Sequence, residues 1–447
     1  MIITVPEKLH MLAKSLSKPL YVVGGVCRDA LASMNVSGRL DWDICAPLSA
    51  ETVADKAQSL GIDVVAVYRN TGTVKMEADG EAFEYTCFRT DKYVRGTHSP
   101  VSVCFTEDIA LDARRRDFKC NAVYYDILKG EFVDPLGGIE DIRHRRLTTV
   151  APPEKVFGED GLRLMRLARI AAQTGFTSTA ECKQGACLNA DLIKDVAAER
   201  VWAELSAILS ADVKYGVYGG QYAGLKLLKE IGVLEIILPE LTLGDKMAQR
   251  KDFHDHDVLE HSLRAVLYAP LQIRLAALLH DVGKPYCLIN YGKFSRHDEV
   301  GRQMSLDICA RLKVPSKLAQ RVSQLVGLHM YDLSCAASEN KVRKFIVNHY
   351  AVLDELLMLK QADYSACKDD LSVAPCVKKW KAVIEKMKAE GVPFTLKQLN
   401  VKGNELIEAG ICAEQAGKTL NFLLEQAAMG CVPNQKERLI LSAIKNV

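Results

Sequence analysis

The chain has 447 residues, of which 49% are hydrophobic and 26% charged, so it is long enough to bury several cores. Its 58 lysines and arginines almost balance its 56 aspartates and glutamates, and a net charge of +2 excludes a globally basic protein; a nucleic-acid partner would need a local basic face. The N-terminus lacks the apolar core of a secretion signal, and no apolar run of about 18 residues follows. We therefore expect a cytoplasmic protein without a membrane segment.

The cysteines agree with this location. The chain has 14 of them, no two spaced as in a C-x-x-C motif, and several, such as Cys45, Cys87 and Cys120, stand in segments that read as buried. Small buried thiols suit a reducing compartment, whereas disulfide frameworks and zinc fingers show paired spacings. The sequence therefore predicts free thiols.

The first 150 residues alternate short β-rich runs with turns, which is typical of a mixed α/β domain with a small sheet. Helical periodicity replaces this pattern after Pro152-Pro153 and continues to the end. The sequence therefore predicts an α+β fold. The expected strands cover residues 20–25, 42–47, 63–69, 73–77, 83–89, 120–127 and 146–150, and the expected domains cover 1–150 (head), 151–247 (helical neck and body), 248–370 (histidine-rich helices) and 371–447 (lysine-rich helical tail).

The stretch "LYVVGGVCRDALASMNVSGRLDWDICAP", residues 20–47, carries the first candidate site. Asp41 and Asp43 stand two residues apart, so on a strand both carboxylates share one face and repel each other unless a cation lies between them. Such hard oxygen ligands suit Mg²⁺ together with substrate phosphates. Gly24 and Gly25 allow a phosphate to approach the backbone, and Arg28 offers a forked donor. For Asp-x-Asp alone, a solvated strand edge beside an ordinary turn is the simpler alternative.

The ordered set of apolar strand, G-G-x-x-R-D and D-x-D resembles the nucleotidyltransferases of the DNA polymerase β superfamily. It is most similar to the class II branch, the bacterial tRNA nucleotidyltransferases (CCA-adding enzymes) and their poly(A) polymerase relatives. The resemblance implies a polymerase-β-like head with a small mixed sheet, followed by an all-α neck, body and tail. "DPLGGIEDIRHRRL", residues 134–147, matches the stretch that closes the head in that family.

A second segment supports the resemblance. "DARRRDFKCNAV", residues 112–123, is similar to the family's D-L-x-R-R-D-F-T-x-N-A and departs from it at Ala113 and Lys119. In the family this segment senses the ribose and the triphosphate, since a carboxylate can accept from a 2′-hydroxyl and guanidinium groups can answer phosphate charge. The implied nucleotide-binding residues are Asp112, Arg115, Arg116, Asp117 and Asn121.

Two further features of the head follow from the resemblance. Glu84 is a candidate third carboxylate, because the superfamily usually places one on a neighbouring strand; an exposed strand glutamate is the equal alternative. The loop "TDKYVRGTHSP", residues 90–100, lies where the family has a mobile segment, and its polar composition is compatible with mobility.

The stretch "EDGLRLMRLAR", residues 159–169, places Asp160, Arg163, Arg166 and Arg169 every third residue, so we expect them along one side of a helix. An acidic first turn followed by salt-bridging arginines would explain the pattern without function. The resemblance implies that Asp160 and Arg163 read the incoming base in place of a template. Cytosine and adenine both present an amino donor beside a ring-nitrogen acceptor, which a carboxylate and a guanidinium match; uracil and guanine do not. Arg166 would orient this pair or meet phosphate.

Histidines cluster in the middle of the chain. His280 and Asp281 adjoin each other in the apolar segment "IRLAALLHDVGK", where buried charge needs a partner such as a metal. The set resembles the HD phosphohydrolase superfamily, H…HD…D with optional further histidines. Imidazole and carboxylate ligands together suit Mn, Fe, Ni, Co or Zn better than Mg²⁺, and a bound metal would supply hydroxide for phosphate-ester hydrolysis. A vestigial HD fold that only packs is the alternative. The implied ligands are His261, His280, Asp281 and Asp363, with His297 and His329 for a second metal or phosphate and Lys284 for phosphate.

The resemblance implies template-independent addition of C, C and A to the tRNA 3′ end from CTP and ATP. Asp41 and Asp43 would hold two Mg²⁺ ions, and a basic face of body and tail would bind tRNA through its phosphates. Several alternatives stay open: a poly(A) polymerase, against which the E-D-x-x-R pattern argues, a CC-only or A-only enzyme, an enzyme that is mainly a hydrolase, or a silent RNA-binding protein. The oligomeric state is not predicted.

Overall fold

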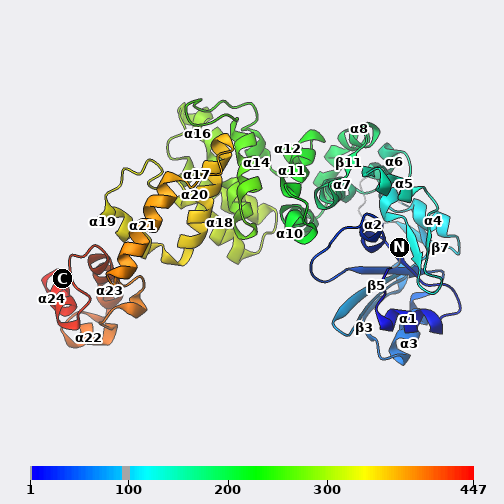
Figure 1. Ribbon diagram of the computed structural model, residues 1–447, viewed down its shortest axis with the longest axis horizontal. Coiled ribbons are helices and arrows are strands. Elements are labelled where there is room, and N and C mark those ends of the chain that lie inside the picture. Colours follow the sequence, from blue (N-terminus) through cyan, green and yellow to red (C-terminus); the bar gives the residue numbers. More distant parts are fainter. Residues whose placement is uncertain (1–2, 93–100, 447) are drawn as a thin grey trace. The chain divides into compact units, whose positions relative to one another are not determined.

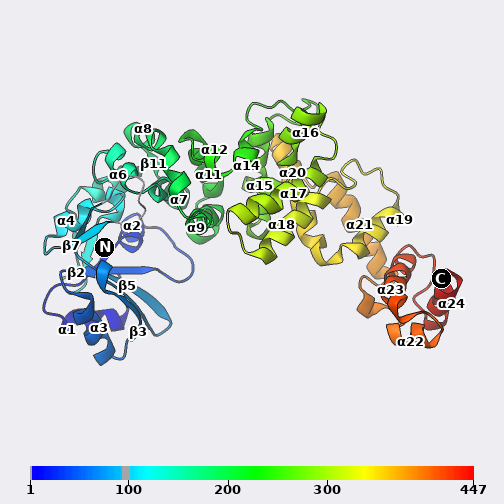
Figure 2. The same cartoon turned by 180° about the vertical axis from the view of Figure 1, so that it is seen from behind.

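The computed structural model describes residues 3–92 and 101–446 and divides into two compact units (Figures 1 and 2). One unit holds Met1–Thr242 with Arg311–Val314, and the other holds Leu243–Ala310 with Pro315–Val447. Most of the loop predicted to be mobile, residues 93–100, lies outside the described residues. None of the helices in the described ranges combines the length and the apolar character that a bilayer span requires.

A seven-stranded sheet forms the head, in the order β3-β4-β5-β2-β1-β8-β9. The β2–β5 pair is parallel and the other pairs are antiparallel, so the predicted mixed sheet is confirmed. A separate ladder pairs β6 with β7, and a short parallel pair joins β10 to β11. The strands are β1 Tyr21–Val23, β2 Trp42–Ala46, β3 Asp63–Tyr68, β4 Thr73–Ala78, β5 Glu81–Cys87, β6 Arg89–Lys92, β7 Ser102–Phe105, β8 Tyr124–Asp126, β9 Glu131–Val133, β10 Arg146–Leu147 and β11 Thr177–Ser178.

Alternation along the strands separates the core from the site. Trp42 and Ile44 are almost fully buried, whereas Asp43 between them is exposed on the other face, as a period of two requires. A second cluster lies on the face that carries Asp43: Phe88 and Tyr124 meet edge to face with ring centroids 6.1 Å apart, in a core that also contains Ala113. The core thus fixes both β2 and the chain around residue 113, which carry the acidic and basic sides of the site.

Helices make up the rest of the first unit. α7 packs closely on α11, because glycines lie where a side chain would not fit: a Cβ at Gly220 would lie 2.2 Å from the Ala172 carbonyl oxygen. The helices are α1 Glu7–Ser15, α2 Gly25–Leu31, α3 Ala50–Ser59, α4 Ile109–Arg114, α5 Gly138–Arg143, α6 Pro153–Glu159, α7 Leu162–Thr174, α8 Ala180–Leu188, α9 Ala198–Leu209, α10 Ala211–Tyr215, α11 Gly220–Glu230, α12 Leu234–Ile237 and α13 Pro239–Thr242.

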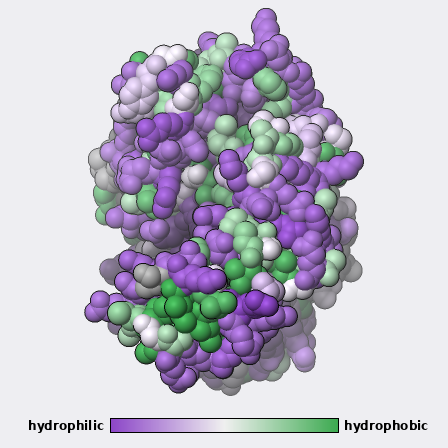
Figure 3. Space-filling view, turned by 90° about the vertical axis from the view of Figure 1, so that its left-hand side faces the viewer, coloured by the Kyte–Doolittle hydropathy of each residue, from purple (hydrophilic) through white to green (hydrophobic). Residues whose placement is uncertain are grey.

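The second unit is helical in its described residues, as the periodicity predicted. Its centre is the pair α14 and α20, whose buried faces carry His261 and Asp363. In Figure 3, which looks onto the side of the chain that lies at the left in Figure 1, most of the surface is hydrophilic and one area is hydrophobic. The helices are α14 Val258–Tyr268, α15 Arg274–Leu279, α16 Gly283–Tyr291, α17 His297–Arg311, α18 Ser316–Leu328, α19 Glu339–Asn348, α20 Leu353–Lys368, α21 Pro375–Ala389, α22 Gly403–Glu408, α23 Ala413–Ala428 and α24 Lys436–Asn446.

Candidate functional sites

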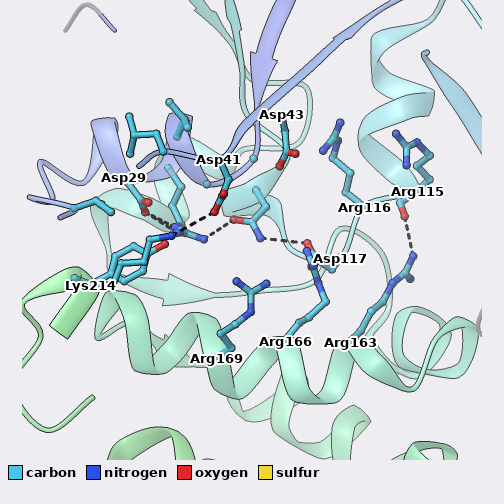
Figure 4. Close-up of a pocket in the computed structure, with 18 of the residues that line it drawn as sticks. Asp29, Asp41, Asp43, Arg115, Arg116, Asp117, Arg163, Arg166, Arg169 and Lys214 are labelled. Carbon is cyan, nitrogen blue, oxygen red and sulfur yellow. Dashed lines mark hydrogen bonds and ion pairs between the residues drawn. The ribbon is translucent and has the colours of Figure 1, made fainter. Parts of the chain in front are cut away.

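A polar cleft of about 300 Å³ lies in the first unit, between the strand ends of the head and one side of α7 (Figure 4). Seven arginines and one lysine line it against five aspartates, so its lining carries an excess of positive charge. Such a cleft suits an anionic ligand that brings its own cations, as a nucleoside triphosphate does.

Two of the predicted carboxylates, Asp41 and Asp43, line this cleft, and the third, Glu84, lies beside Asp43 but outside the lining. Asp43 on β2 pairs in register with Glu84 on the parallel strand β5, and Asp41 lies immediately before β2. Although solvent reaches the Asp43 side chain, desolvation by surrounding protein atoms, together with the charges of Glu84 and Asp41, raises its pKa to about 6 against the opposing effect of Arg116. The mutual repulsion of these acids would be relieved by a divalent cation, and their oxygen donors fit Mg²⁺, although their carboxylates do not form a compact ligand group like those of the second unit in the described residues.

The glycine turn reaches the same carboxylate. Gly24 has φ +82° and ψ −140°, which only glycine adopts easily, and a Cβ there would lie 3.0 Å from Oδ2 of Asp43. Arg28, predicted to offer its fork to phosphate, is buried instead: Nε donates to Asp29 at 2.7 Å and Nη1 to the Asn121 amide oxygen at 2.9 Å. Arg28 lines the cleft, and its partner Asp29 holds the guanidinium in place.

Asp112 supports the basic side of the cleft from behind. It is fully buried and accepts from Arg115 Nε at 2.7 Å, Arg116 Nη2 at 3.2 Å and the Tyr124 hydroxyl at 2.7 Å. Burial alone would raise its pKa, but Arg116 and Arg115 hold that pKa below the ordinary value. The cleft lining includes both arginines but not Asp112, so this residue acts by orienting them.

A chain of hydrogen bonds crosses the cleft floor from the head to α7. From Arg28 it passes to Asn121, whose amide nitrogen donates to Asp117 at 3.3 Å, and Asp117 accepts from Arg166 Nε at 2.6 Å (Figure 4). Despite burial, which opposes ionisation, Arg166 and Arg163 lower the pKa of Asp117 to about 2. Asp117 is therefore ionised and already engaged on the protein side.

The prediction that Asp160 lies on one helix with the arginines is wrong. Asp160 stands in extended conformation between α6 and α7, and its Oδ1 accepts from the Leu162 amide at 3.0 Å. Its other oxygen lies 4.0 Å from Arg200. The break has a packing reason, because a Cβ at Gly161 would lie 2.5 Å from the Leu192 carbonyl oxygen. The Asp-Gly dipeptide signals this helix start, which the run of regularly spaced charges hid.

Arg163, Arg166 and Arg169 do share the side of α7 that faces the cleft (Figure 4). Arg163 is almost buried, and its guanidinium donates to Glu159 at 2.8 Å and to the Arg115 carbonyl oxygen at 2.8 Å. The same side chain thus borders the cleft and ties α7 to the segment that carries Arg115.

Sequence reasoning missed several lining residues. Lys214 on α10 lies 3.3 Å from Oδ2 of Asp41, and its backbone carbonyl accepts from the Ser37 amide at 2.8 Å. Asp91 is buried between Arg89 and Arg115, at 3.0 and 3.7 Å. No local motif marks either residue, because Lys214 is far from Asp41 in sequence and Asp91 lies in the polar segment that we expected to be a mobile loop, whereas it belongs to β6.

The second unit brings all six predicted HD residues together. Nε2 of His261 lies 3.0 Å from Asp363 and 3.2 Å from Nε2 of His280, and the ligand atoms of this trio all lie within 4.8 Å of one another. Asp281, His297 and His329 form a second trio of the same compactness. Asp281 links the two trios: its Oδ2 is 3.3 Å from Nε2 of His280 and its Oδ1 is 3.1 Å from Nε2 of His297. Imidazoles and carboxylates in two linked trios fit transition-metal ligation.

Buried charges surround these trios. Although burial lowers it, the pKa of His280 rises to about 10 beside Asp281 and Asp363. Lys284, predicted to contact phosphate, forms an ion pair with Asp281 at 2.6 Å. Lys360, which sequence reasoning missed, is fully buried, and its Nζ donates to the His329 and Tyr331 carbonyls at 2.7 and 2.6 Å. It therefore holds the chain that presents His329.

His254 was also missed. It lies in the loop before α14, its ring meets that of His261 edge to face with centroids 4.9 Å apart, and burial together with His261 and Lys284 lowers its pKa to about 4. The run "HDHDVLEH", residues 254–261, contained the signal, but nothing in its sequence distinguishes His254 from the neighbouring His256.

The fold and the two sites define a class of protein, a polymerase-type nucleotidyl-transfer head joined to helical segments and an HD domain. Models of known families match accordingly: the poly A polymerase head domain over residues 20–148, the probable RNA and SrmB-binding site of polymerase A over residues 175–243, and the HD domain over residues 258–366.

Known proteins narrow the class. The chain is 36% identical to an A-adding tRNA nucleotidyltransferase of Deinococcus radiodurans over 58% of this chain and 60% of that relative, and 32% identical to a multifunctional CCA protein of Chromobacterium violaceum over 66% of this chain and 70% of that relative. The fold matches a crystal structure of the Bacillus stearothermophilus CCA-adding enzyme in complex with CTP, with a TM-score of 0.68 at 22% identity over 99% of this chain and 98% of that one. The chain belongs to the family of bacterial-type tRNA nucleotidyltransferases, the CCA-adding enzymes, with an HD domain.

Proposed function

We propose that this protein adds C, C and A to the 3′ end of tRNA, without a template, from CTP and ATP. One observation supports the proposal: a single cleft is lined by Asp41 and Asp43 on one side, with Glu84 in register beside Asp43, and by the arginines of α7 on another side, so metal ligands and cationic groups would face the same bound nucleotide. A cytoplasmic location belongs to the same proposal, since all 14 cysteines, every one within the described residues, are free.

The residues of the cleft divide the work. Asp41, Asp43 and Glu84 would hold Mg²⁺, which when bound supplies Lewis-acid activation of the tRNA 3′-hydroxyl and neutralises the leaving pyrophosphate. The Gly24 turn leaves room for the triphosphate beside Asp43. Arg116, held in place by Asp112, would bind the negatively charged phosphates. The reaction joins the 3′-oxygen to the α-phosphorus and breaks the bond from that phosphorus to pyrophosphate.

Base selection falls to the region where α6 meets α7. Arg163 borders the cleft and is oriented by Glu159, so it can donate to the ring nitrogen of cytosine or adenine. Asp160 uses one carboxylate oxygen to cap α7 and can turn the other toward an exocyclic amino group. A carboxylate–guanidinium pair of this kind rejects uracil and guanine, at about 1–3 kcal/mol for each mismatched buried contact.

The test uses three tRNA substrates: one lacking CCA, one ending in C and one ending in CC, each with CTP, ATP or both. Full addition with both nucleotides supports the proposal. Extension only to CC, or only from CC, shows a partial enzyme, and A-tailing without C incorporation shows a poly(A) polymerase. An Asp43→Asn variant serves as the inactive control.

We propose metal-dependent phosphohydrolysis as a second activity, located in the second unit. The two linked trios around Asp281 support it, because they present buried nitrogen and oxygen donors with charges that a metal would balance. Ni, Mn, Co, Fe or Zn would fit these ligands. If the two activities are separate, His280→Ala abolishes phosphoesterase activity and spares tRNA extension, whereas Asp41→Ala does the reverse.

The tail offers a surface for tRNA phosphates. Along α21, Lys378, Lys381, Lys386 and Lys388 are exposed. We propose that this helix contributes to tRNA binding, in which case affinity falls steeply with salt and Lys378→Glu/Lys381→Glu reduces the salt slope.

A further inference from the structure

His261 has a second face that the HD trio does not use. Its Nε2 points to His280 and Asp363, whereas Nδ1 on the opposite side of the ring is buried and has no hydrogen-bond partner within residues 3–92 and 101–446. Nδ1 of His254, whose ring lies against the same imidazole, is likewise buried and unpartnered in that part of the chain. Buried imidazole nitrogens without a partner are unusual and call for one, such as a bound ion or an ordered water.

A thiol completes the arrangement. Cys367 follows Asp363 by one turn of α20, and its Sγ lies 3.3 Å from the Asp363 carbonyl oxygen. The Cys367 carbonyl accepts from the Asp255 amide at 3.0 Å, so the loop that carries His254 is fixed to the helix that carries the thiol. One ligand atom each from His254, His261 and Cys367 lies within 4.8 Å of the others.

From this geometry we propose that His254, His261 and Cys367 form a further transition-metal position beside the HD trios. Two imidazoles and a thiolate suit Zn²⁺ and its probe Co²⁺, and they exclude Mg²⁺. On binding, the thiol releases its proton to solvent as the sulfur–metal bond forms. A neutral imidazole offers one lone pair, so a metal here withdraws His261 from the HD trio unless that ring also loses its second proton and bridges the two positions.

The sulfur gives this position a signal that the HD trios cannot produce, because their ligands are nitrogen and oxygen. The full-length protein, stripped of metal, is titrated with Co²⁺ while thiolate-to-cobalt charge-transfer absorption is followed in the near ultraviolet. We expect the band in the native protein, its loss in Cys367→Ser and its retention in Cys412→Ser, a matched control at an exposed cysteine of the same unit. His254→Ala should weaken Co²⁺ binding at this band by about tenfold or more.

A second measurement needs no variant. Zn²⁺ should slow alkylation of Cys367 in the native protein and leave that of Cys412 unchanged, with both sites quantified by mass spectrometry. A native protein that takes up Co²⁺ without a thiolate band, a band that survives in Cys367→Ser, or alkylation of Cys367 at the same rate with and without Zn²⁺ overturns the proposal.

Discussion

Gly24→Ala tests whether the turn after β1 is shaped for the carboxylate opposite it. At φ +82° and ψ −140° an alanine is strained by about 1–3 kcal/mol. Its Cβ would also lie 3.0 Å from Oδ2 of Asp43, so one of the two groups shifts by a few tenths of an ångström. Free energy of unfolding should therefore fall by about 1–3 kcal/mol.

The same substitution should also lower the rate of nucleotide addition, separately from its effect on stability. A misplacement of about 1 Å at a reacting centre costs about 100-fold in rate, so a smaller shift of Asp43 should lower CMP incorporation about 10–100-fold. Initial rates are measured on tRNA lacking CCA, at a temperature where urea unfolding shows the variant to be folded.

Gly38→Ala is the matched control. Gly38 has nearly the same φ, +83°, in the same unit, but a Cβ there would have no neighbour within 4 Å. It shares the positive φ and lacks the contact with Asp43. If Gly24→Ala loses no more activity than Gly38→Ala, the close approach to the carboxylate has no catalytic role and the reasoning fails.

Three further predictions concern charged side chains of the two sites. The raised pKa of Asp43, about 6, means that the folded protein binds this proton more tightly than the unfolded chain, so the carboxylate costs stability as pH rises from about 4 through 6. In EDTA, Asp43→Asn should raise the melting temperature more at pH 8 than at pH 4, and equal gains would refute this sign. Arg166→Gln leaves Asp117 buried without its main cation and should lower the free energy of unfolding by about 1–3 kcal/mol. Measured by urea unfolding, the double variant Asp117→Asn/Arg166→Gln should recover part of this loss. If the losses of the two single variants simply add, the two side chains do not interact. Lys360→Met leaves the buried His329 carbonyl without its hydrogen-bond donor. It should therefore lower metal-dependent phosphoesterase activity and leave CMP incorporation unchanged. Loss of both activities would indicate global unfolding instead.

Local patterns predicted the head well. The strand at Trp42–Ala46 follows from alternation, and that alternation also put Trp42 in the core and Asp43 on the site face. Glu84 was a candidate from the resemblance, and the parallel register of β2 and β5 places it opposite Asp43. These features depend on period and neighbouring strands, which a sequence carries locally.

What could not be predicted depends on packing between distant segments. The guanidinium of Arg28 is hydrogen-bonded to Asp29 and Asn121. Lys214, on α10 of the helical neck, forms an ion pair with Asp41. Asp160 left its expected helix because Gly161 packs on the Leu192 carbonyl. A charged residue in a motif has the same sequence signature whether it faces substrate or braces its neighbours, and only the fold distinguishes the two.

The hydrogen bonds that run from Arg28 through Asn121 and Asp117 to Arg166 determine the width of the cleft between the head and α7. With the bond from Arg163 to the Arg115 carbonyl, they tie the α7 side of the cleft to the head. If the proposed function is correct, this hydrogen-bonded frame holds the two sides of the cleft at a fixed separation, although cytosine and adenine differ in size. The change in the selected nucleotide from CTP to ATP then depends on movement of the tRNA 3′ end and of individual side chains within the cleft, and not on a tilt of α7.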